Sequence, residues 1–360
     1  MKKYVALLLL CLACSQTKND QPESFITTFE STQGLETATY DDVIAYYTKL
    51  ADTYAEIEIQ PVGETDSGRP LHLVTLNPEG QFDFDKIRSN KRIILINNGI
   101  HPGESDGIDA SMMLFRDLVQ GKISMPQHTI LATIPVYNVG GSLNRNATTR
   151  TNQNGPKEYG FRGNARNYDL NRDFIKSDTK NAKAFTEIFH LVKPDVFIDN
   201  HVSNGADYQY VLTHLFTQHN KLGGELGAYL HEQMMPKLET SLLEKNWDIT
   251  PYVNVFNRTP DQGFTQFMDS PRYSTGYTTM FNTFGMMVET HMLKPYKMRV
   301  EQTYELLFSM LDFTEKNSTK IKDLRANAVE NILSNKTYPI QFSVDRENPS
   351  NFNFKGYEGT

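Results

Sequence analysis

The sequence predicts an α/β protein with a mixed, largely parallel central sheet and helices on both faces. Short apolar runs without hydrophobic alternation recur along the chain, at residues 93–96, 130–136, 196–198 and 286–288. Runs of this kind are typical of strands that are buried on both faces. Two segments between these runs, residues 108–119 and 182–192, carry apolar side chains at helical spacing. Strands that alternate with helices favour a largely parallel sheet sandwiched by helices.

Local signals place several further elements. Thr39 is a suitable N-cap for a helix that reaches about residue 54. Residues 56–59 and 71–74 alternate between apolar and polar side chains, which predicts two half-buried strands. We expect a helix over residues 222–243 to be interrupted or kinked near Pro236, because proline cannot donate a backbone hydrogen bond.

The C-terminal part of the chain changes character after one more helix. Residues 295–314 have helical apolar spacing and should close a main domain that spans residues 38–320. The extension that follows, residues 321–360, contains a strand-like run at residues 338–344. A strand needs neighbours, so this run would either pair with the main sheet or begin a further β domain, and we expect the second.

The first residues resemble a bacterial export signal. Two lysines precede an apolar run at residues 4–13, which is about half as long as a membrane-spanning helix. We therefore expect a signal peptide at residues 1–14. A small residue precedes Cys14, as in the cleavage box of bacterial lipoproteins, although Cys11 stands where those proteins usually have leucine. This predicts a lipid anchor at Cys14 and a location in the cell envelope; ordinary secretion is the alternative.

Composition sets further limits on the fold and its partners. Residues 15–37 are polar and look like a flexible tether. Both cysteines lie in the leader, so the folded part must be stabilised without disulfides. The net charge is −7 and no basic stripe is present, which argues against a nucleic-acid partner.

Candidate functional side chains directly follow the predicted buried strands. His101 and Glu104 come after the first of them, His201 after the third and Glu289 after the fourth. Because ligands of open α/β sheets bind beyond the carboxyl ends of the strands, we expect these side chains to meet in one crevice.

The first three of these side chains are candidate metal ligands. His101 and Glu104 are three residues apart in a loop with glycine and proline, so both can point at one ion. His201, 97 residues after Glu104, can supply the third ligand. Two imidazoles and one carboxylate leave one coordination position open, which is the arrangement of catalytic zinc.

Five motifs in order resemble the zinc metallocarboxypeptidases of the carboxypeptidase A and B superfamily, most closely the D, E and N subgroup. The motifs lie between about residues 40 and 311. They are His101-Pro102-Gly103-Glu104, Asn-Val-Gly-Gly at residues 138–141 where the family has Asn-Pro-Asp-Gly, residues 162–174 around Leu-Asn-Arg, His201 after its strand, and Gly-Met-Met-Val-Glu-Thr at residues 285–290.

The resemblance implies one zinc ion per chain, bound by the three candidate ligands. Glu289 would be the base that takes a proton from water and returns it to the leaving amine. Asp169 would accept a hydrogen bond from His101 and fix the tautomer of its ring.

The resemblance also implies how the substrate is held. Arg162 would polarise the scissile carbonyl, with Arg166 as a rival for this role. Asn171 and Arg172 would bind the free C-terminal carboxylate of a peptide, since a guanidinium can hold a carboxylate through two hydrogen bonds.

A mobile tyrosine that closes over the substrate is a further feature of the family. Tyr273 and Tyr277 are the nearest candidates in this sequence, and we prefer Tyr277. Arg272 is a candidate for selecting an acidic terminal side chain, and the alternative is that it pairs with Asp269.

The sequence therefore predicts an exported zinc carboxypeptidase that removes C-terminal amino acids from peptides. One alternative is a zinc amidohydrolase of the same fold, such as an N-acyl amino acid deacylase or an enzyme that trims peptidoglycan peptides. Another is a lipoprotein that uses the fold for binding without catalysis.

Overall fold

A computed structural model describes residues 25–255 and 258–358. Within these residues, eight strands form one sheet in the order β1-β2-β4-β3-β5-β8-β6-β7. The strands are β1 (Ile57–Glu64), β2 (Pro70–Leu76), β3 (Arg92–Asn97), β4 (Thr129–Ile134), β5 (Val196–Ser203), β6 (Leu212–Phe216), β7 (Ile249–Pro251) and β8 (Phe284–His291).

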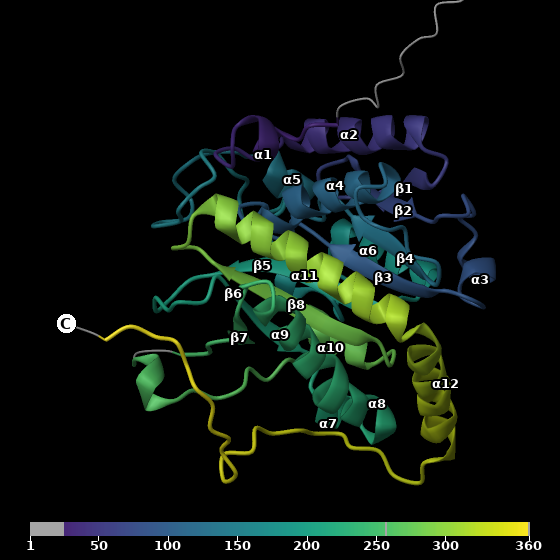
Figure 1. Cartoon of the computed structure of the whole chain (residues 1–360), viewed down its shortest axis with the longest axis vertical. Helices are drawn as coiled ribbons and strands as arrows, with labels where there is room; N and C mark the ends of the chain where they lie inside the picture. The colour runs from purple at the N-terminus through teal and green to yellow at the C-terminus, as the bar shows by residue number, and fades with distance from the viewer. Residues whose placement is uncertain (1–24, 256–257, 359–360) are drawn as a thin grey trace, which may run out of the picture.

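The helices lie on both faces of this sheet (Figure 1). They are α1 (Thr28–Ser31), α2 (Tyr40–Thr53), α3 (Phe84–Ile87), α4 (Asp106–Val119), α5 (Val139–Ser142), α6 (Lys180–Val192), α7 (His219–Leu222), α8 (Gly224–Tyr229), α9 (Met235–Leu243), α10 (Ser274–Thr279), α11 (Tyr296–Lys316) and α12 (Ser318–Ser334). Single 3₁₀ turns are η1 (Leu170–Arg172) and η3 (Pro260–Gln262), and η2 (Leu230–Met234) is a π-helical turn.

The centre of the sheet is parallel and its flanks are mixed. Strands β4, β3, β5 and β8 are parallel neighbours, whereas β2 and β6 run antiparallel to β4 and β8. All residues of β3, β4, β5 and β8 are buried, as the lack of hydrophobic alternation predicted. Helices α4 and α11 pack together on one face, and α6 and α10 meet on the other (Figure 1). The predicted mixed α/β fold is thereby confirmed.

Six of the seven strands predicted from the sequence are present, but the run at residues 338–344 forms none, and β6 and β7 were missed. Strand β6 has only five residues, and two of them, Thr213 and His214, are polar. His214 is tolerated in the interior because its ring lies 2.9 Å from the Glu239 carboxylate. Because β6 contains these polar side chains, a search for apolar runs does not detect it.

Predicted features of the helices are also confirmed. The Thr39 side chain accepts a hydrogen bond from the Asp42 amide and caps α2. The segment over residues 222–243 is divided into α8, the π turn η2 and α9, with Pro236 in the first turn of α9. The irregular turn precedes the residue that cannot donate a backbone hydrogen bond, as expected for proline.

The predicted flexible tether is wrong for its second half. Residues 15–24 lie outside the described part of the chain, whereas residues 25–37 pack on the domain. Phe25 and Phe29 are buried in the core, and the Glu30 carboxylate pairs with Arg116 of α4. The main domain thus begins before residue 38, because two phenylalanines outweigh the polar composition around them.

The prediction for the C-terminal extension is also corrected. The expected boundary at residue 320 falls inside α12, whose Ile321 and Leu324 belong to the core. Residues 338–344 form no strand, and Ile340 is 99% exposed. The apolar run has the composition of a strand but finds no neighbour to pair with. The signal peptide and Cys14 lie outside the described residues, and among the helices that the structure describes none has the length and apolarity to cross a membrane.

Candidate metal centre and catalytic pocket

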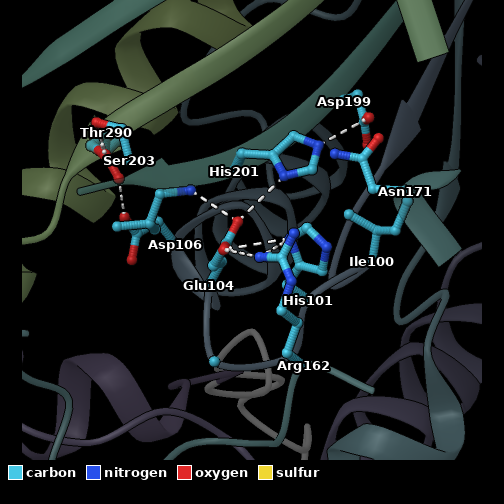
Figure 2. A network of polar contacts seen from close by, with 12 residues as sticks. Ile100, His101, Glu104, Asp106, Arg162, Asn171, Asp199, His201, Ser203 and Thr290 are labelled. Atoms are coloured by element: carbon cyan, nitrogen blue, oxygen red, sulfur yellow. Dashed lines mark hydrogen bonds and ion pairs between the residues drawn. The ribbon is translucent and has the colours of Figure 1, made fainter. Parts of the chain in front are cut away.

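The two histidines and the glutamate predicted as ligands meet at the carboxyl end of the sheet. His101 and Glu104 lie in the loop between β3 and α4, and His201 lies near the end of β5. One potential ligand atom from each of the three lies within 4.8 Å of the others. Figure 2 shows the Glu104 carboxylate between the two imidazole rings. Its two oxygens lie 3.2 Å from His101 Nδ1 and 3.1 Å from His201 Nδ1.

Both histidine rings are oriented by a carboxylate on their far side. His101 Nε2 lies 3.0 Å from Asp169, and His201 Nε2 lies 2.9 Å from Asp199. A carboxylate at Nε2 holds the proton there and leaves Nδ1 free to bind a metal. Burial alone would raise the pKa of Asp169, but the hydrogen bonds and charges of His101 and Arg162 hold it well below its usual value.

These residues fit a zinc ion. Tetrahedral zinc with bonds of 2.0–2.1 Å to nitrogen keeps neighbouring ligand atoms about 3.3 Å apart. The separations between the Glu104 oxygens and the two Nδ1 atoms are close to this value. All three side chains are buried, and an N₂O donor set of this kind is found in catalytic zinc sites.

The register of the sheet places Glu289 beside the metal candidates. Strand β8 is parallel to β5, and Glu289 pairs with His201. Its Oε2 atom is buried and has no hydrogen-bond partner among the described residues. Burial raises the pKa of Glu289 to about 8, partly offset by the charge of His201. A dication close by would lower this pKa again, which is what a base at neutral pH requires.

The loop that carries the predicted substrate residues is held by the motif at residues 138–141. The Asn138 side chain donates to the Arg162 carbonyl and accepts from the Gly141 amide, each at 2.9 Å. A side chain at Gly141 would place its Cβ only 2.4 Å from the Phe161 carbonyl oxygen. Only glycine therefore lets the two loops approach, and this explains why Arg162 reaches the metal candidates.

One cavity of about 820 Å³ contains most of the predicted site residues. Its lining includes the three metal candidates together with Glu289, Arg162, Asn171, Arg172 and Tyr273. Arg162 pairs with Asp169 at 2.9 Å and extends to within 3.7 Å of Glu104. Its rival Arg166 lies outside this lining, with its guanidinium over the Tyr168 ring. The structure therefore favours Arg162 over Arg166 as the arginine of the site.

The tyrosine preference made from the sequence is wrong. Tyr277 is only 4% exposed and packs against Phe185 and Phe189 in the core, so it is not part of the cavity. Tyr273 lines the cavity, and the Arg172 guanidinium lies 4.8 Å above its ring. Tyr277 lies within α10 and is buried, whereas Tyr273 precedes the helix and lies at the site.

Arg272 is likewise absent from the lining of the cavity. The carboxylate of Asp269, its proposed partner, is bound by Lys221 at 2.6 Å. Neither form of the Arg272 hypothesis is supported by these contacts.

Two residues of the site were not identified from the sequence. Asp199 precedes His201 by two positions, so both side chains project from the same face of β5, and this alternation was the available signal. Arg150 lies in an irregular loop and donates to Glu104 at 2.6 Å. No local pattern points to Arg150, because its partner is 46 positions away in the sequence.

Comparisons with known proteins agree with this geometry. Residues 43–194 match the family model described as zinc carboxypeptidase. Among solved structures, a metallo-carboxypeptidase from Burkholderia cenocepacia has a TM-score of 0.55 at 15% identity, covering 76% of this chain and 69% of that one. The fold is that of the zinc carboxypeptidases.

Two further structures of this fold are similar to the chain. Carboxypeptidase A from Helicoverpa armigera has a TM-score of 0.55 at 12% identity, over 78% of this chain and 74% of its own. A metallo-carboxypeptidase from Pseudomonas aeruginosa has a TM-score of 0.53 at 13% identity, over 77% and 68%. Comparison with curated proteins found no match.

The matched segment of the zinc carboxypeptidase model contains His101, Glu104 and the loop from Arg162 to Arg172, and ends before His201 and Glu289. The last two residues are brought to the site by the pairing of β5 with β8. The resemblance to the zinc carboxypeptidases is thus confirmed for the fold and for residues 43–194, and the closer resemblance to the D, E and N subgroup stays a prediction.

Proposed function

We propose that this chain is a zinc-dependent metallocarboxypeptidase that removes C-terminal amino acids from peptides. One observation carries the proposal: a single cavity holds the metal candidates, Glu289, and an arginine and an asparagine able to bind a terminal carboxylate, and Glu289 Oε2 has no hydrogen-bond partner among the described residues. The match of residues 43–194 to the zinc carboxypeptidases and the shared fold support it.

The reaction would use the residues in separate roles. Zinc, when bound, would act as a Lewis acid on the scissile carbonyl and lower the pKa of water. Glu289 would accept the proton of the attacking water at Oε2 and later give it to the leaving amine. Arg162 would donate to the oxygen that becomes negative during attack, where preorganised positive charge contributes most.

The terminal carboxylate of the peptide would be held at the other end of the cavity. Arg172 offers a planar pair of donors, and its contact with the Tyr273 ring limits the positions of the guanidinium. The Asn171 amide adds a further donor. Because these groups lie at a fixed distance from the metal candidates, the cut would fall at the last peptide bond.

The experiment that tests the proposal combines metal analysis with hydrolysis of matched peptides. We expect about one zinc per chain, release of the last residue from a blocked dipeptide with a free carboxylate, and loss of both after chelation. The same peptide with an amidated C-terminus should not be cleaved. Equal cleavage of the amidated peptide would instead favour an amidohydrolase, and zinc without any cleavage would favour a binding protein.

We also propose that the chain is exported and anchored to the cell envelope through a lipid at Cys14. The charged and apolar leader and the small residue before Cys14 support this proposal. Metabolic labelling with a radioactive fatty acid tests it. Label should enter the wild-type protein and be lost in Cys14→Ala; unlabelled wild-type protein would contradict it.

A further inference from the structure

Arg150 makes contacts that the proposed reaction does not use. It lies in the loop between α5 and Tyr159, and its side chain is only 14% exposed. One terminal nitrogen donates to Glu104 Oε1 at 2.6 Å, and the other donates to the Val202 carbonyl at 2.9 Å. Its Nε atom donates to the Gln153 side chain. All three guanidinium nitrogens are therefore engaged within the protein.

The loop around the metal candidates is shaped to receive this arginine. A side chain at Gly103 would place its Cβ only 2.6 Å from Arg150 Cδ. Gln153, which accepts from Arg150, donates in turn to the Gly103 carbonyl at 2.9 Å. The glycine in the His101-Pro102-Gly103-Glu104 motif thus makes room for Arg150.

The contacts of Arg150 determine how the Glu104 carboxylate is turned. Oε1 of Glu104 receives Arg150 and faces His101, whereas Oε2 receives the Val202 amide at 2.9 Å and faces His201. Because Val202 follows His201 on β5, one guanidinium joins the two segments that carry the metal candidates. Each oxygen has its own donor, so rotation of the carboxylate would break a charge-assisted hydrogen bond.

We propose that Arg150 is a positioning residue that holds Glu104 in the orientation required for binding zinc. The inference rests on the metal site of the proposed function and assigns Arg150 no contact with substrate. Both arginines line the cavity, but the Arg162 side chain is 45% exposed, whereas that of Arg150 is only 14% exposed. Partners of this kind, in contact with a ligand rather than with the metal, commonly change metal affinity when they are removed.

The test is the dissociation constant for zinc, measured by competition with a fluorescent chelator. Arg150→Gln removes the positive charge and the two terminal donor nitrogens of the guanidinium but keeps a polar side chain. We expect it to bind zinc about 10- to 100-fold more weakly than the wild type. Arg150→Lys keeps the charge but can reach only one acceptor at a time, so its loss should be smaller than that of Arg150→Gln.

Arg145 in the same loop offers a matched control. Its guanidinium donates to the carbonyls of Thr37, Ala38 and Glu158, and these hydrogen bonds reach no metal candidate. Arg145→Gln should lower the unfolding temperature of the metal-free protein while zinc affinity stays within about twofold of the wild type. This variant separates loss of stability from loss of ligand orientation.

Three outcomes would overturn the inference. They are a zinc affinity of Arg150→Gln equal to that of the wild type, a loss of affinity in Arg145→Gln as large as that in Arg150→Gln, and a loss in Arg150→Lys at least as large as that in Arg150→Gln. Peptide cleavage is not the readout, so these outcomes are distinct from failure of the proposed function. Wild-type protein that binds zinc but cleaves no peptide would overturn that function and leave the role of Arg150 intact.

Discussion

The chemistry of Glu289 depends on where strand β8 places its carboxylate in the cavity. Its Oε2 atom is buried without a partner, so the carboxylate is poorly solvated and held close to His201. A buried acid in such a position is a candidate general base, because its proton affinity is raised by its surroundings.

Glu289→Gln is therefore expected to lower kcat by about 10²- to 10⁴-fold, the usual contribution of general acid–base catalysis. Glutamine preserves the shape but cannot take a proton. Zinc content should remain at the wild-type level, because Glu289 is not one of the three ligands. Steady-state kinetics with metal analysis of the same samples checks this, and a variant that keeps more than a tenth of the wild-type kcat would contradict the assignment.

Asp109 of α4 gives the protein a specific dependence on pH. Its carboxylate is fully buried and accepts a hydrogen bond from Tyr296. Burial raises the pKa of Asp109 to about 6, although the hydrogen bond from Tyr296 opposes the shift. The folded state thus favours the protonated acid. This contribution to stability is complete below the unfolded pKa of about 3.9 and is lost as the pH rises through about 6.

Asp109→Asn should remove that dependence. The two pKa values correspond to up to about 3 kcal/mol, so the variant should gain that amount relative to the wild type between pH 4 and pH 7. Urea unfolding of both proteins at several pH values measures the difference. A difference in unfolding free energy that does not vary with pH would exclude this role for Asp109.

The sequence was most informative for residues at strand ends. His101, Glu104, His201 and Glu289 each follow a buried apolar run, and the sheet brings these ends together. Arg150 could not be found in this way, because its position depends on how an irregular loop folds back over Gly103. Tyr277 was misjudged for a related reason: spacing along the chain does not reveal which side of a short helix faces the core.

At the level of the elements, four residues between β7 and α10 line the cavity and form one wall of it: Tyr252, Asn254, Phe267 and Tyr273. Tyr252 and Phe267 meet edge to face at 6.4 Å, and Phe267 meets Tyr273 in the same way at 5.0 Å. Met287 lines the same cavity and precedes Glu289 by two positions on β8, so both project from one face of the sheet. Because Arg172 lies against Tyr273, a carboxylate bound by Arg172 would place the terminal side chain beside this wall.

This wall predicts a preference for apolar or aromatic terminal residues. Among the described residues that line the cavity, the charged side chains are the metal candidates, Glu289 and the three arginines 150, 162 and 172. None remains to neutralise a charged terminal side chain, and burying one without a partner is costly. Peptides ending in Phe or Leu should have kcat/KM values at least about tenfold above those of matched peptides ending in Lys or Glu.

Met287→Lys provides the complementary measurement, because it would add a cation to the wall. The ratio of kcat/KM for terminal Glu to that for terminal Phe should rise at least about tenfold in this variant. Leu293 also lines the cavity but lies beyond the end of β8, so Leu293→Lys serves as the control and should leave the ratio unchanged. Faster release of terminal Lys or Glu by the wild type would show that the wall does not receive the side chain.

For the whole molecule, the sequence predicted the sheet but misplaced both ends of the domain. Composition suggested a tether before residue 38 and a new domain after residue 320. Phe25 and Phe29 near one end, and Ile321 and Leu324 near the other, instead complete the single core. Average polarity over a segment conceals a few large apolar side chains, and these decide whether the segment packs.

The end of the described chain returns to the catalytic side of the molecule. After α12 it runs past α7 and α8 and comes back toward β6 and β7 (Figure 1). There the Gln209 amide donates to the Lys355 carbonyl at 2.9 Å. Phe354 packs against Tyr208, Tyr210 and Phe264, and Phe352 also contacts Phe264. Phe264 belongs to the same loop as Phe267 of the cavity wall.

These aromatic contacts predict that the C-terminal segment stiffens the substrate pocket from outside. The double variant Phe352→Ala/Phe354→Ala would remove the aromatic contacts that hold the cavity wall from outside. Substrate binding would then have to order the wall. We expect KM to rise about tenfold, corresponding to roughly 1.4 kcal/mol, while zinc affinity stays unchanged because the metal candidates lie in the loop after β3 and on β5. Ile340→Ala, in the exposed part of the same segment, should behave as the wild type. A double variant with wild-type KM would mean that the wall is rigid by itself, and an equal rise in Ile340→Ala would point to a general effect of the segment.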